Sequence, residues 1–335
     1  MNTKIVYAVV SNEKDVYLEQ TLVSVYSLRL YNPQAHVILA IDEDTDKTIQ
    51  GKRSEILKYV TEKTVIKVPN KYTQIQRSRY LKTTLRQHII GDFLFIDSDT
   101  IITSSLEDID TFTGEIGAVL DKHLYIKEHP ARKNIHQWAK QIGWEITENT
   151  PQYYNSGVFY VKDTPTTHEF YCRWNSFWTE GCKNKLNLDQ PSLGKTYSTM
   201  PIIKELGGVW NCQILENGLK YLYKAKIIHY FSSCHNDLSY ESPYLFLDKQ
   251  LFMKIKEKGQ ISQEIATMIV EAKSAFSLHY QIYTGKNLQF FSTYPYFFLK
   301  KLYYNYPSLY MCMDKFLSGI GKIKRKFIIL NSLKW

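Results

Sequence analysis

The chain has 335 residues, of which 44% are hydrophobic and 22% charged, values that are ordinary for a soluble globular protein of one large domain or two. The formal net charge of +9 is uneven, because residues 300–335 hold eight Lys or Arg against the single acid Asp314, a net charge of +7 that leaves +2 for everything before. A nearly neutral body with a basic tail does not suggest a nucleic-acid-binding body.

The cysteines and the apolar runs give expectations about location. Five cysteines without close C-x-x-C pairs predict neither a zinc module nor a disulfide framework, and therefore a reducing compartment: Cys172, Cys182, Cys212, Cys234 and Cys312. The first apolar run, Ile5–Val10, is shorter than a signal peptide requires, and no run of 18 apolar residues predicts a membrane span. We therefore expect a cytoplasmic protein, or one peripheral on the inner face of the cell membrane.

The chain opens with the pattern β-α-β. Ile5–Val10 has the continuous apolar character of a buried strand, and His36–Ile41 is a second strand of this kind. Between them a helical stripe ends at Asn32-Pro33; its members are Leu18, Leu22, Val25 and Leu28. This order is typical of a doubly wound parallel sheet.

Two ligand-binding motifs fail on this part of the chain. The acidic cluster Asp42–Asp46 resembles a calcium loop, but Lys47 and Arg53 stand where an EF-hand needs Gly and Glu. We expect a solvated loop there. No Gly-x-Gly-x-x-Gly follows the first strand, so a nicotinamide-dinucleotide fold has no support.

A basic stripe precedes the most informative strand. We expect a helix over Asp46–Val60, a strand over Thr64–Val68 and a helix over Gln74–Ile89. One face of the last helix carries Arg79, Lys82 and Arg86. Such a stripe is by default a solvated face, but here one of its cations, Arg79 foremost, could reach a bound diphosphate.

Two carboxylates follow a short buried strand. Phe93–Ile96 is a run of four apolar residues, and Asp97 and Asp99 come directly after it. Ligands of open α/β sheets bind outside the carboxyl ends of the strands. Two acids at this point repel each other unless a cation lies between them, and hard oxygen ligands suit Mg²⁺ or Mn²⁺. The alternative is a strand that ends in a polar turn.

Further polar residues lie at the ends of later elements. Asp121 follows a strand over Ile116–Leu120, and Asn155 lies early in a strand over Tyr153–Val161. Asp189 is an expected N-cap of a helix with Pro191 in its first turn. The remaining helices are expected over Ala131–Ile142, Thr166–Thr179, Leu245–Lys258 and Ser262–Ala275.

His229 has two interpretations. It lies near the end of an apolar strand, Lys226–Phe231, where a lone histidine is usually a satisfied core residue. The Asp97 and Asp99 pair favours the other interpretation, in which an imidazole completes the shell of a Mn²⁺ ion held by carboxylates.

These residues together form a known set. Over about residues 3–235, the motifs Phe95–Asp99, Asn155–Val158, Asp189-Gln190 and Ile227–Tyr230 follow an N-terminal β-α-β in order. The chain resembles GT-A-fold glycosyltransferases, and most of all glycosyltransferase family 8, the retaining galactosyl- and glucosyltransferases. The resemblance implies an α/β, Rossmann-like, mostly parallel sheet flanked by helices in residues 1–240. Residues 241–335 would be a helical extension with a basic, aromatic tail.

The resemblance also implies roles for single residues. Asp97, Asp99 and His229 would bind Mn²⁺ (or Mg²⁺), and Asp189 and Gln190 would be catalytic. The donor would be held by Val10, Ser11, Asn12, Arg79, Ser98, Asp121 and Asn155. The implied reaction moves a hexose from a nucleotide-diphosphate sugar, a UDP-sugar, to a glycan or lipid-linked saccharide with retention.

The chain departs from the family pattern at two points. After its histidine the family shows Gly-x-x-Lys-Pro-Trp, whose lysine contacts phosphate, whereas this chain has Tyr230–His235, so Lys224 or His235 would have to substitute. Asp189-Gln190 is followed by Pro191 where the family has Asp. Two alternatives stay open: a catalytically inactive sugar-nucleotide-binding protein, and a haloacid-dehalogenase-type phosphatase. The phosphatase carries its Asp-x-Asp motif on the first strand, and has Thr or Val where Ile101 stands here.

The tail combines cations with large rings. Residues 290–310 interleave aromatic residues with Lys300 and Lys301, and the basic segment Lys322–Leu330 follows. This composition is typical of an interfacial segment that binds an anionic membrane surface. The alternative is a helix that packs on the body with a basic outer face.

Overall fold

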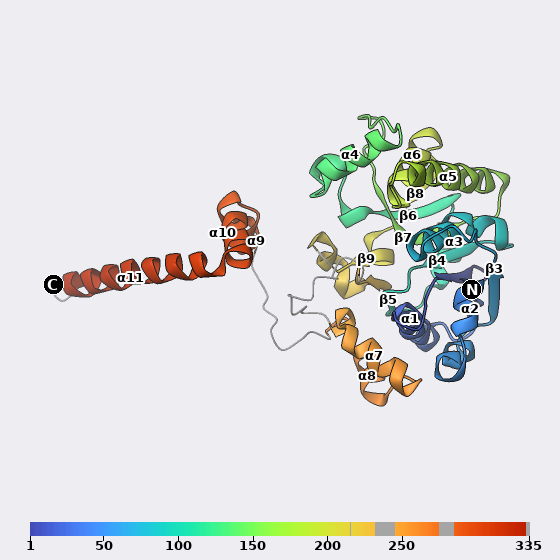
Figure 1. Cartoon of the computed structure of the whole chain (residues 1–335), viewed down its shortest axis with the longest axis horizontal. Coiled ribbons are helices and arrows are strands. Elements are labelled where there is room, and N and C mark those ends of the chain that lie inside the picture. The colour runs from blue at the N-terminus through green and yellow to red at the C-terminus, as the bar shows by residue number, and fades with distance from the viewer. Residues whose placement is uncertain (215, 232–244, 275–284, 333–335) are drawn as a thin grey trace. The chain divides into compact units, whose positions relative to one another are not determined.

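The computed structural model describes residues 1–214, 216–231, 245–274 and 285–332. The chain forms two compact units, Met1–Leu278 and His279–Trp335 (Figure 1). The first unit extends past residue 240, where the sequence suggested a boundary, because helices α7 (Lys249–Lys258) and α8 (Gln263–Val270) contribute apolar side chains to the same core as the N-terminal strands.

A seven-stranded sheet forms the centre of the first unit. Every neighbouring pair in it is parallel except the two made by β7, which is antiparallel to β4 and β6. The fold is therefore the mostly parallel α/β sheet expected from the sequence. In spatial order the strands are β3 (Glu62–Ile66), β2 (Val37–Asp42), β1 (Lys4–Val9), β4 (Phe93–Ile96), β7 (Tyr154–Val161), β6 (Ile116–Leu120) and β8 (Ile203–Glu205).

Helices cover both faces of the sheet, which explains the continuous apolar runs (Figure 1). In β1, Ile5 and Tyr7 point to a core shared with α1 (Tyr17–Tyr31), α7 and α8. Val6 points to the opposite core, shared with α3 (Gln74–His88), α5 (Pro165–Lys183) and α6 (Gln190–Thr199). A third, smaller cluster lies around α4 (Arg132–Gln141).

A second, three-stranded sheet brings distant segments together. Its order is β5 (Thr100–Ile102), β10 (Ile227–His229) and β9 (Cys212–Gln213). The antiparallel pairing of β10 with β5 places His229 opposite Thr100. This pairing brings the Asp97–Asp99 segment beside His229, which lies 130 positions after Asp99 in the chain.

The single helix expected over Asp46–Val60 is wrong. Helix α2 (Glu43–Thr48) and the 3₁₀ helix η1 (Gly51–Lys58) occupy this region, with Ile49 and Gln50 between them. Gly51, where η1 begins, has a φ of +54°, so α2 cannot continue through it as a right-handed helix. The acidic cluster is also not a solvated loop. Asp42 is buried, accepts a hydrogen bond from the Thr45 amide as the N-cap of α2, and forms a 2.9 Å ion pair with Arg77.

Further 3₁₀ helices lie in the described connections of the first unit. They are η2 (Glu107–Thr111), η3 (Asp121–His123), η4 (Ile126–Glu128), η5 (Gly208–Asn211), η6 (Glu216–Lys224) and η8 (Leu245–Leu247).

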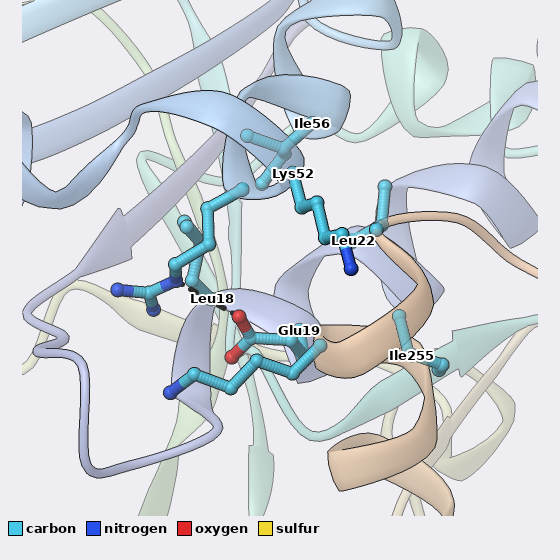
Figure 2. A pocket seen from close by; sticks show the side chains of 9 residues that line it. Leu18, Glu19, Leu22, Lys52, Ile56 and Ile255 are labelled. Atoms are coloured by element: carbon cyan, nitrogen blue, oxygen red, sulfur yellow. Dashed lines mark hydrogen bonds and ion pairs between the residues drawn. The ribbon is translucent and has the colours of Figure 1, made fainter.

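A small cavity marks where α7 meets α1 and η1 (Figure 2). Its volume of about 10 Å³ is no larger than one water molecule, so it is a packing defect and not a substrate site. Glu19 and Arg53 form a buried 2.9 Å ion pair there. Lys256 of α7 donates to the backbone oxygens of Glu13 and Asp15, which ties α7 to the loop after β1.

The second unit is helical, as the sequence predicted for the tail. It comprises α9 (Gly285–Phe291), α10 (Tyr294–Asn305) and α11 (Pro307–Ser332). Among the described residues, no helix is both long and apolar enough to cross a membrane. Large apolar side chains that stay exposed on this unit include Tyr294, Phe297, Phe298, Tyr303, Tyr306, Leu309, Met311, Phe316 and Leu317.

Candidate metal and donor site

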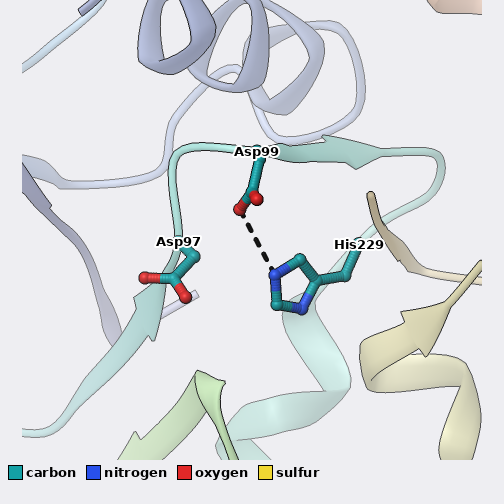
Figure 3. A group of neighbouring side chains, drawn as sticks. All are labelled: Asp97, Asp99 and His229. Atoms are coloured by element: carbon teal, nitrogen blue, oxygen red, sulfur yellow. Dashed lines mark ion pairs between the residues drawn. The ribbon is translucent and has the colours of Figure 1, made fainter. Parts of the chain in front are cut away.

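Asp97, Asp99 and His229 lie together, as the sequence predicted (Figure 3). One ligand atom from each lies within 4.8 Å of the others, and His229 Nε2 is 3.3 Å from Asp99 Oδ1. Two carboxylates and an imidazole form a donor set that suits Mn²⁺, and the carboxylates also suit Mg²⁺. The three residues fit the metal that the resemblance implies.

Backbone hydrogen bonds hold this group in place. The Asp97 amide donates to the Gly157 oxygen of β7 at 2.8 Å, and the Tyr230 amide donates to the Asp99 oxygen at 2.9 Å. Gly157 lies directly against the site, because a Cβ atom added there would stand 2.3 Å from His229 Cε1 and 2.8 Å from Asp97 Oδ2. A side chain at position 157 would therefore displace a candidate metal ligand.

Lys82 belongs to the site and not to a solvated face. Its side chain is only 5% exposed, and its Nζ lies 3.0 Å from Asp97 Oδ1 and 3.8 Å from Asp189 Oδ2. The solvated interpretation of the basic stripe is wrong for Arg86 as well. Arg86 is buried and binds the backbone oxygens of Ile89 and Gly91, so its role is to close the turn before β4.

Asp189 is not an N-cap in the usual sense. Its backbone already has right-handed helical angles, and its side chain makes no capping hydrogen bond. Arg79 Nε lies 3.0 Å from its Oδ1, and Ser156 donates to its Oδ2 at 2.8 Å. Burial alone would raise the pKa of Asp189, but Lys82 and Arg79 lower it below the ordinary value.

Burial and neighbouring charges shift the pKa values of Asp97 and His229. Removal from bulk water raises the pKa of Asp97, which Lys82 opposes and the nearby Asp99 carboxylate reinforces. Burial alone would lower the pKa of His229, yet the charge of Asp99 raises it above the ordinary value. The charge of Asp99 adds to the raised pKa of Asp97, so the two carboxylates repel each other, and a bound divalent cation would relieve this repulsion.

Asp121 and Asn155 form a second polar group. Asp121 accepts from Asn155 Nδ2 at 2.8 Å and pairs with His129 Nε2 at 2.9 Å. Gln190 also forms a hydrogen bond with Asp121. Its neighbour Asp189 contacts Arg79 instead, so the two candidate catalytic residues have different partners. Burial would raise the pKa of Asp121, but the hydrogen bonds from His129 and Asn155 lower it below its ordinary value.

The residues expected to hold the nucleoside lie at the end of β1. Val10 is buried in the core, and the Ser11 hydroxyl contacts Asp15 and Arg53. The Asn12 backbone amide donates a hydrogen bond to the Asp15 carboxylate, and its side-chain amide donates to the Gln74 side-chain oxygen. The Ser98 hydroxyl accepts a hydrogen bond from the Thr21 hydroxyl of α1 at 2.9 Å.

Sequence reasoning gave Lys82 too little weight and missed His129 and Asn211. The i+3 spacing of Lys82 from Arg79 was the available signal, because both must share a helix face. Nothing in the local sequence marks His129 or Asn211. Of the two substitutes for the missing phosphate lysine, Lys224 is exposed at the end of η6, and His235 lies outside the described residues.

Comparison with known proteins gives structural likeness alone. No protein-family model matches the chain, and no curated protein matches its sequence. A crystal structure of the galactosyltransferase LgtC with donor and acceptor sugar analogues covers 79% of this chain and 99% of its own, at 13% identity and a TM-score of 0.50. An active-site mutant of LgtC covers 78% and 98%, at 14% identity and a TM-score of 0.52. The chain therefore has the GT-A fold of these glycosyltransferase structures.

Proposed function

We propose that this protein is a metal-dependent glycosyltransferase that moves a hexose from a UDP-sugar to a glycan or lipid-linked saccharide with retention of configuration. One observation carries the proposal: Lys82 contacts both Asp97 and Asp189, which joins the candidate metal group to the candidate catalytic pair Asp189-Gln190. The likeness to LgtC, whose structure holds donor and acceptor sugar analogues, supports it.

Asp97, Asp99 and His229 would hold Mn²⁺ or Mg²⁺. The bound ion would neutralise the charge that builds on the leaving diphosphate. Lys82 pairs with Asp97 and Arg79 pairs with Asp189, and both cations would stabilise the same developing charge. We propose that Arg79 and Lys82 substitute for the phosphate-binding lysine that the family has after its histidine.

Asp189 and Gln190 would face the reacting sugar. Because its pKa is lowered, Asp189 is ionised at neutral pH, and a carboxylate stabilises the positive charge that develops on the sugar ring. Asp121 and Asn155 offer a carboxylate and an amide to sugar hydroxyls, and Ser98 and Val10–Asn12 would complete the donor site. We leave open whether Asp189 or Gln190 attacks the sugar, or whether the acceptor attacks from the same face.

Turnover separates this function from the two alternatives. The test is release of UDP from a panel of UDP-sugars with Mn²⁺, by wild type, by Asp189→Asn and by the surface control Arg173→Ala. We expect metal-dependent release with one sugar, a loss of about a hundredfold or more in Asp189→Asn, and wild-type rates in the control. No release with any nucleotide sugar would favour an inactive binding protein. The phosphatase alternative would need an Asp-x-Asp motif on the first strand, whereas here it follows β4.

We also propose that the second unit binds an anionic membrane surface at the inner face of the cell membrane. Exposed aromatic side chains such as Phe297 and Phe298 accompany Lys300 and Lys301 on α10. Rings at the headgroup boundary and cations for anionic lipid are what an interfacial helix needs. Such attachment would suit an enzyme that extends a lipid-linked saccharide.

A further inference from the structure

A chain of buried hydrogen bonds runs from His229 to His129. His229 Nδ1 lies 3.0 Å from Asn211 Oδ1, and Asn211 Nδ2 lies 2.9 Å from Asn155 Oδ1. Asn155 Nδ2 then lies 2.8 Å from Asp121 Oδ1, and His129 Nε2 lies 2.9 Å from Asp121 Oδ2. Each of these five residues, taken with its backbone, is at least 93% buried. The proposed metal group and the proposed donor-sugar group are thus parts of one network.

The direction of the bonds is fixed at Asn155 by a backbone group. The Gly157 amide donates to Asn155 Oδ1 at 2.9 Å, and a backbone N–H can only donate. Asn155 therefore presents its Nδ2 to Asp121, which accepts as a carboxylate. Because Asn155 Oδ1 is the acceptor, the atom of Asn211 that meets it must be the donor Nδ2.

The orientation of Asn211 in turn decides the tautomer of His229. With its Nδ2 directed at Asn155, Asn211 presents its oxygen to His229. An amide oxygen only accepts, so His229 Nδ1 must carry a proton and donate it. The nitrogen that remains for Asp99 and a metal ion is Nε2, which lies 3.3 Å from Asp99 Oδ1.

The far end of the network is fixed in the same way. The Ala131 amide donates to His129 Nδ1 at 3.0 Å, so the proton of this imidazole lies on Nε2 and points to Asp121. The backbone amides of Gly157 and Ala131 thus fix which atom donates and which accepts at each hydrogen bond of the network. Asn211, fully buried in the middle, is the one link between His229 and the Asn155 group in this network.

We infer that Asn211 is a positioning residue that holds His229 with Nδ1 protonated and Nε2 presented to the metal. The inference rests on the proposed metal site and extends it to a residue outside the proposed ligand set, whose hydrogen bonds are to His229 and Asn155. Partners that orient a ligating histidine in this way commonly change metal affinity by about 10- to 100-fold when they are removed.

The test compares two substitutions of Asn211 with a matched control. Asn211→Leu removes both bonds, whereas Asn211→Asp is nearly isosteric, loses the donor to Asn155 Oδ1 and keeps an acceptor for His229 Nδ1. The control is Asn32→Leu, since Asn32 is another buried asparagine. It lies at the end of α1, and its Oδ1 accepts a hydrogen bond from the Leu106 backbone amide. Mn²⁺ affinity is measured by calorimetry on the full chain. The ring-nitrogen chemical shifts of His229 are measured in the metal-free protein at alkaline pH, where imidazoles are neutral.

We expect wild type to show a protonated Nδ1 at His229. Asn211→Leu should lose this signature and bind Mn²⁺ about 10- to 100-fold more weakly, while Asn211→Asp and Asn32→Leu stay within a few-fold of wild type. Wild-type Mn²⁺ affinity and His229 shifts in Asn211→Leu would overturn the inference, as would equal weakening in folded Asn211→Asp. If wild type itself binds no Mn²⁺, the proposed function fails, and the nitrogen shifts alone decide the role of Asn211.

Discussion

Lys82 Nζ and Asp97 Oδ1 form a 3.0 Å ion pair in which the lysine side chain is almost fully buried. The same ammonium lies 3.8 Å from Asp189 Oδ2, so one protein cation serves two carboxylates with different proposed roles. A buried lysine is stable only where anions compensate it, and Asp97 and Asp189 supply this compensation. Lys82 therefore ties helix α3 to the metal group and to the start of α6.

Lys82→Met tests this coupling, because methionine keeps the length of the side chain and removes its charge. We expect the free energy of unfolding of the metal-free protein to fall by about 1–3 kcal/mol, since Asp97 and Asp189 lose their counter-charge. Mn²⁺ should then raise the melting temperature by more than it does in wild type, because Asp97 depends on the metal for neutralisation. Thermal unfolding with and without Mn²⁺ measures both effects. An equal metal-induced shift in wild type, Lys82→Met and the exposed control Lys140→Met would contradict the account.

Gly157→Ala should disturb the candidate metal ligands by steric clash alone. The added Cβ would stand 2.3 Å from His229 Cε1, so the imidazole or the strand must move. We expect a loss of about 1–3 kcal/mol in stability and of at least about tenfold in Mn²⁺ affinity, measured by thermal unfolding and calorimetry. The matched control is Gly207→Ala, where an added Cβ meets no atom within 4 Å. Unchanged Mn²⁺ affinity in Gly157→Ala would show that the site is wrongly placed.

Asp121→Asn should have an effect on stability that depends on pH. The pKa of Asp121 is lowered in the folded protein, so its carboxylate stabilises the fold above the ordinary carboxyl pKa of 3.8. That contribution is lost as the pH falls through the lower folded-state value. Asparagine at this position would also turn a donor toward either Asn155 Nδ2 or His129 Nε2, at a cost of about 1–3 kcal/mol.

The measurement for Asp121 is chemical unfolding of wild type and Asp121→Asn from neutral pH to about pH 3. We expect a constant difference in unfolding free energy down to about pH 5 and a smaller one below about pH 4. The comparison cancels the other carboxyl groups, which titrate in both proteins. A difference that stays constant to the lowest pH would rule out a stabilising ionised Asp121.

Charge reversal in the tail should weaken membrane binding. The double variant Lys300→Glu with Lys301→Glu is compared with Lys133→Glu and Lys140→Glu, two exposed lysines of α4. In sedimentation with anionic phosphatidylglycerol vesicles, we expect the tail variant of the full chain to bind about tenfold more weakly or worse, and the α4 variant to bind as wild type does. Added salt should weaken wild-type binding. Equal binding of wild type to neutral vesicles would refute an electrostatic membrane segment.

Local patterns predicted much of the fold. Strands such as Phe93–Ile96 were readable because burial on both faces of a sheet leaves a continuous apolar run. Helices such as Gln74–Ile89 were readable because burial of one helix face leaves a helical period. The helix expected over Asp46–Val60 was wrong because a positive φ at Gly51 is set by tertiary context, and Gly alone does not predict it. The α7 and α8 helices were predicted, but their membership of the first core depends on long-range contacts.

The candidate site also contains residues that local sequence predicts and residues that only long-range contacts reveal. Asp97 and Asp99 were predicted from their place after a buried strand, and His229 from its chemistry beside them. Lys82 looked like a solvated residue, because a sequence does not reveal that its ammonium lies against Asp97, Asp189 and the Phe95 ring. Asn211 and His129 acquire their roles only through hydrogen bonds to residues far away in the chain.

The central claim is that Asp97, Asp99 and His229 form a metal site that binds the diphosphate of a nucleotide sugar. Calorimetric titration of UDP into wild type and Asp99→Ala, with and without Mn²⁺, tests it most directly. Asp46→Ala is the control, because it removes only a surface ion pair with Lys63. We predict UDP binding that requires Mn²⁺ in wild type and in the control, and that Asp99→Ala abolishes. UDP binding that is unaffected by Mn²⁺ or by Asp99→Ala would contradict the claim, as would the absence of binding by UDP, GDP and CMP alike.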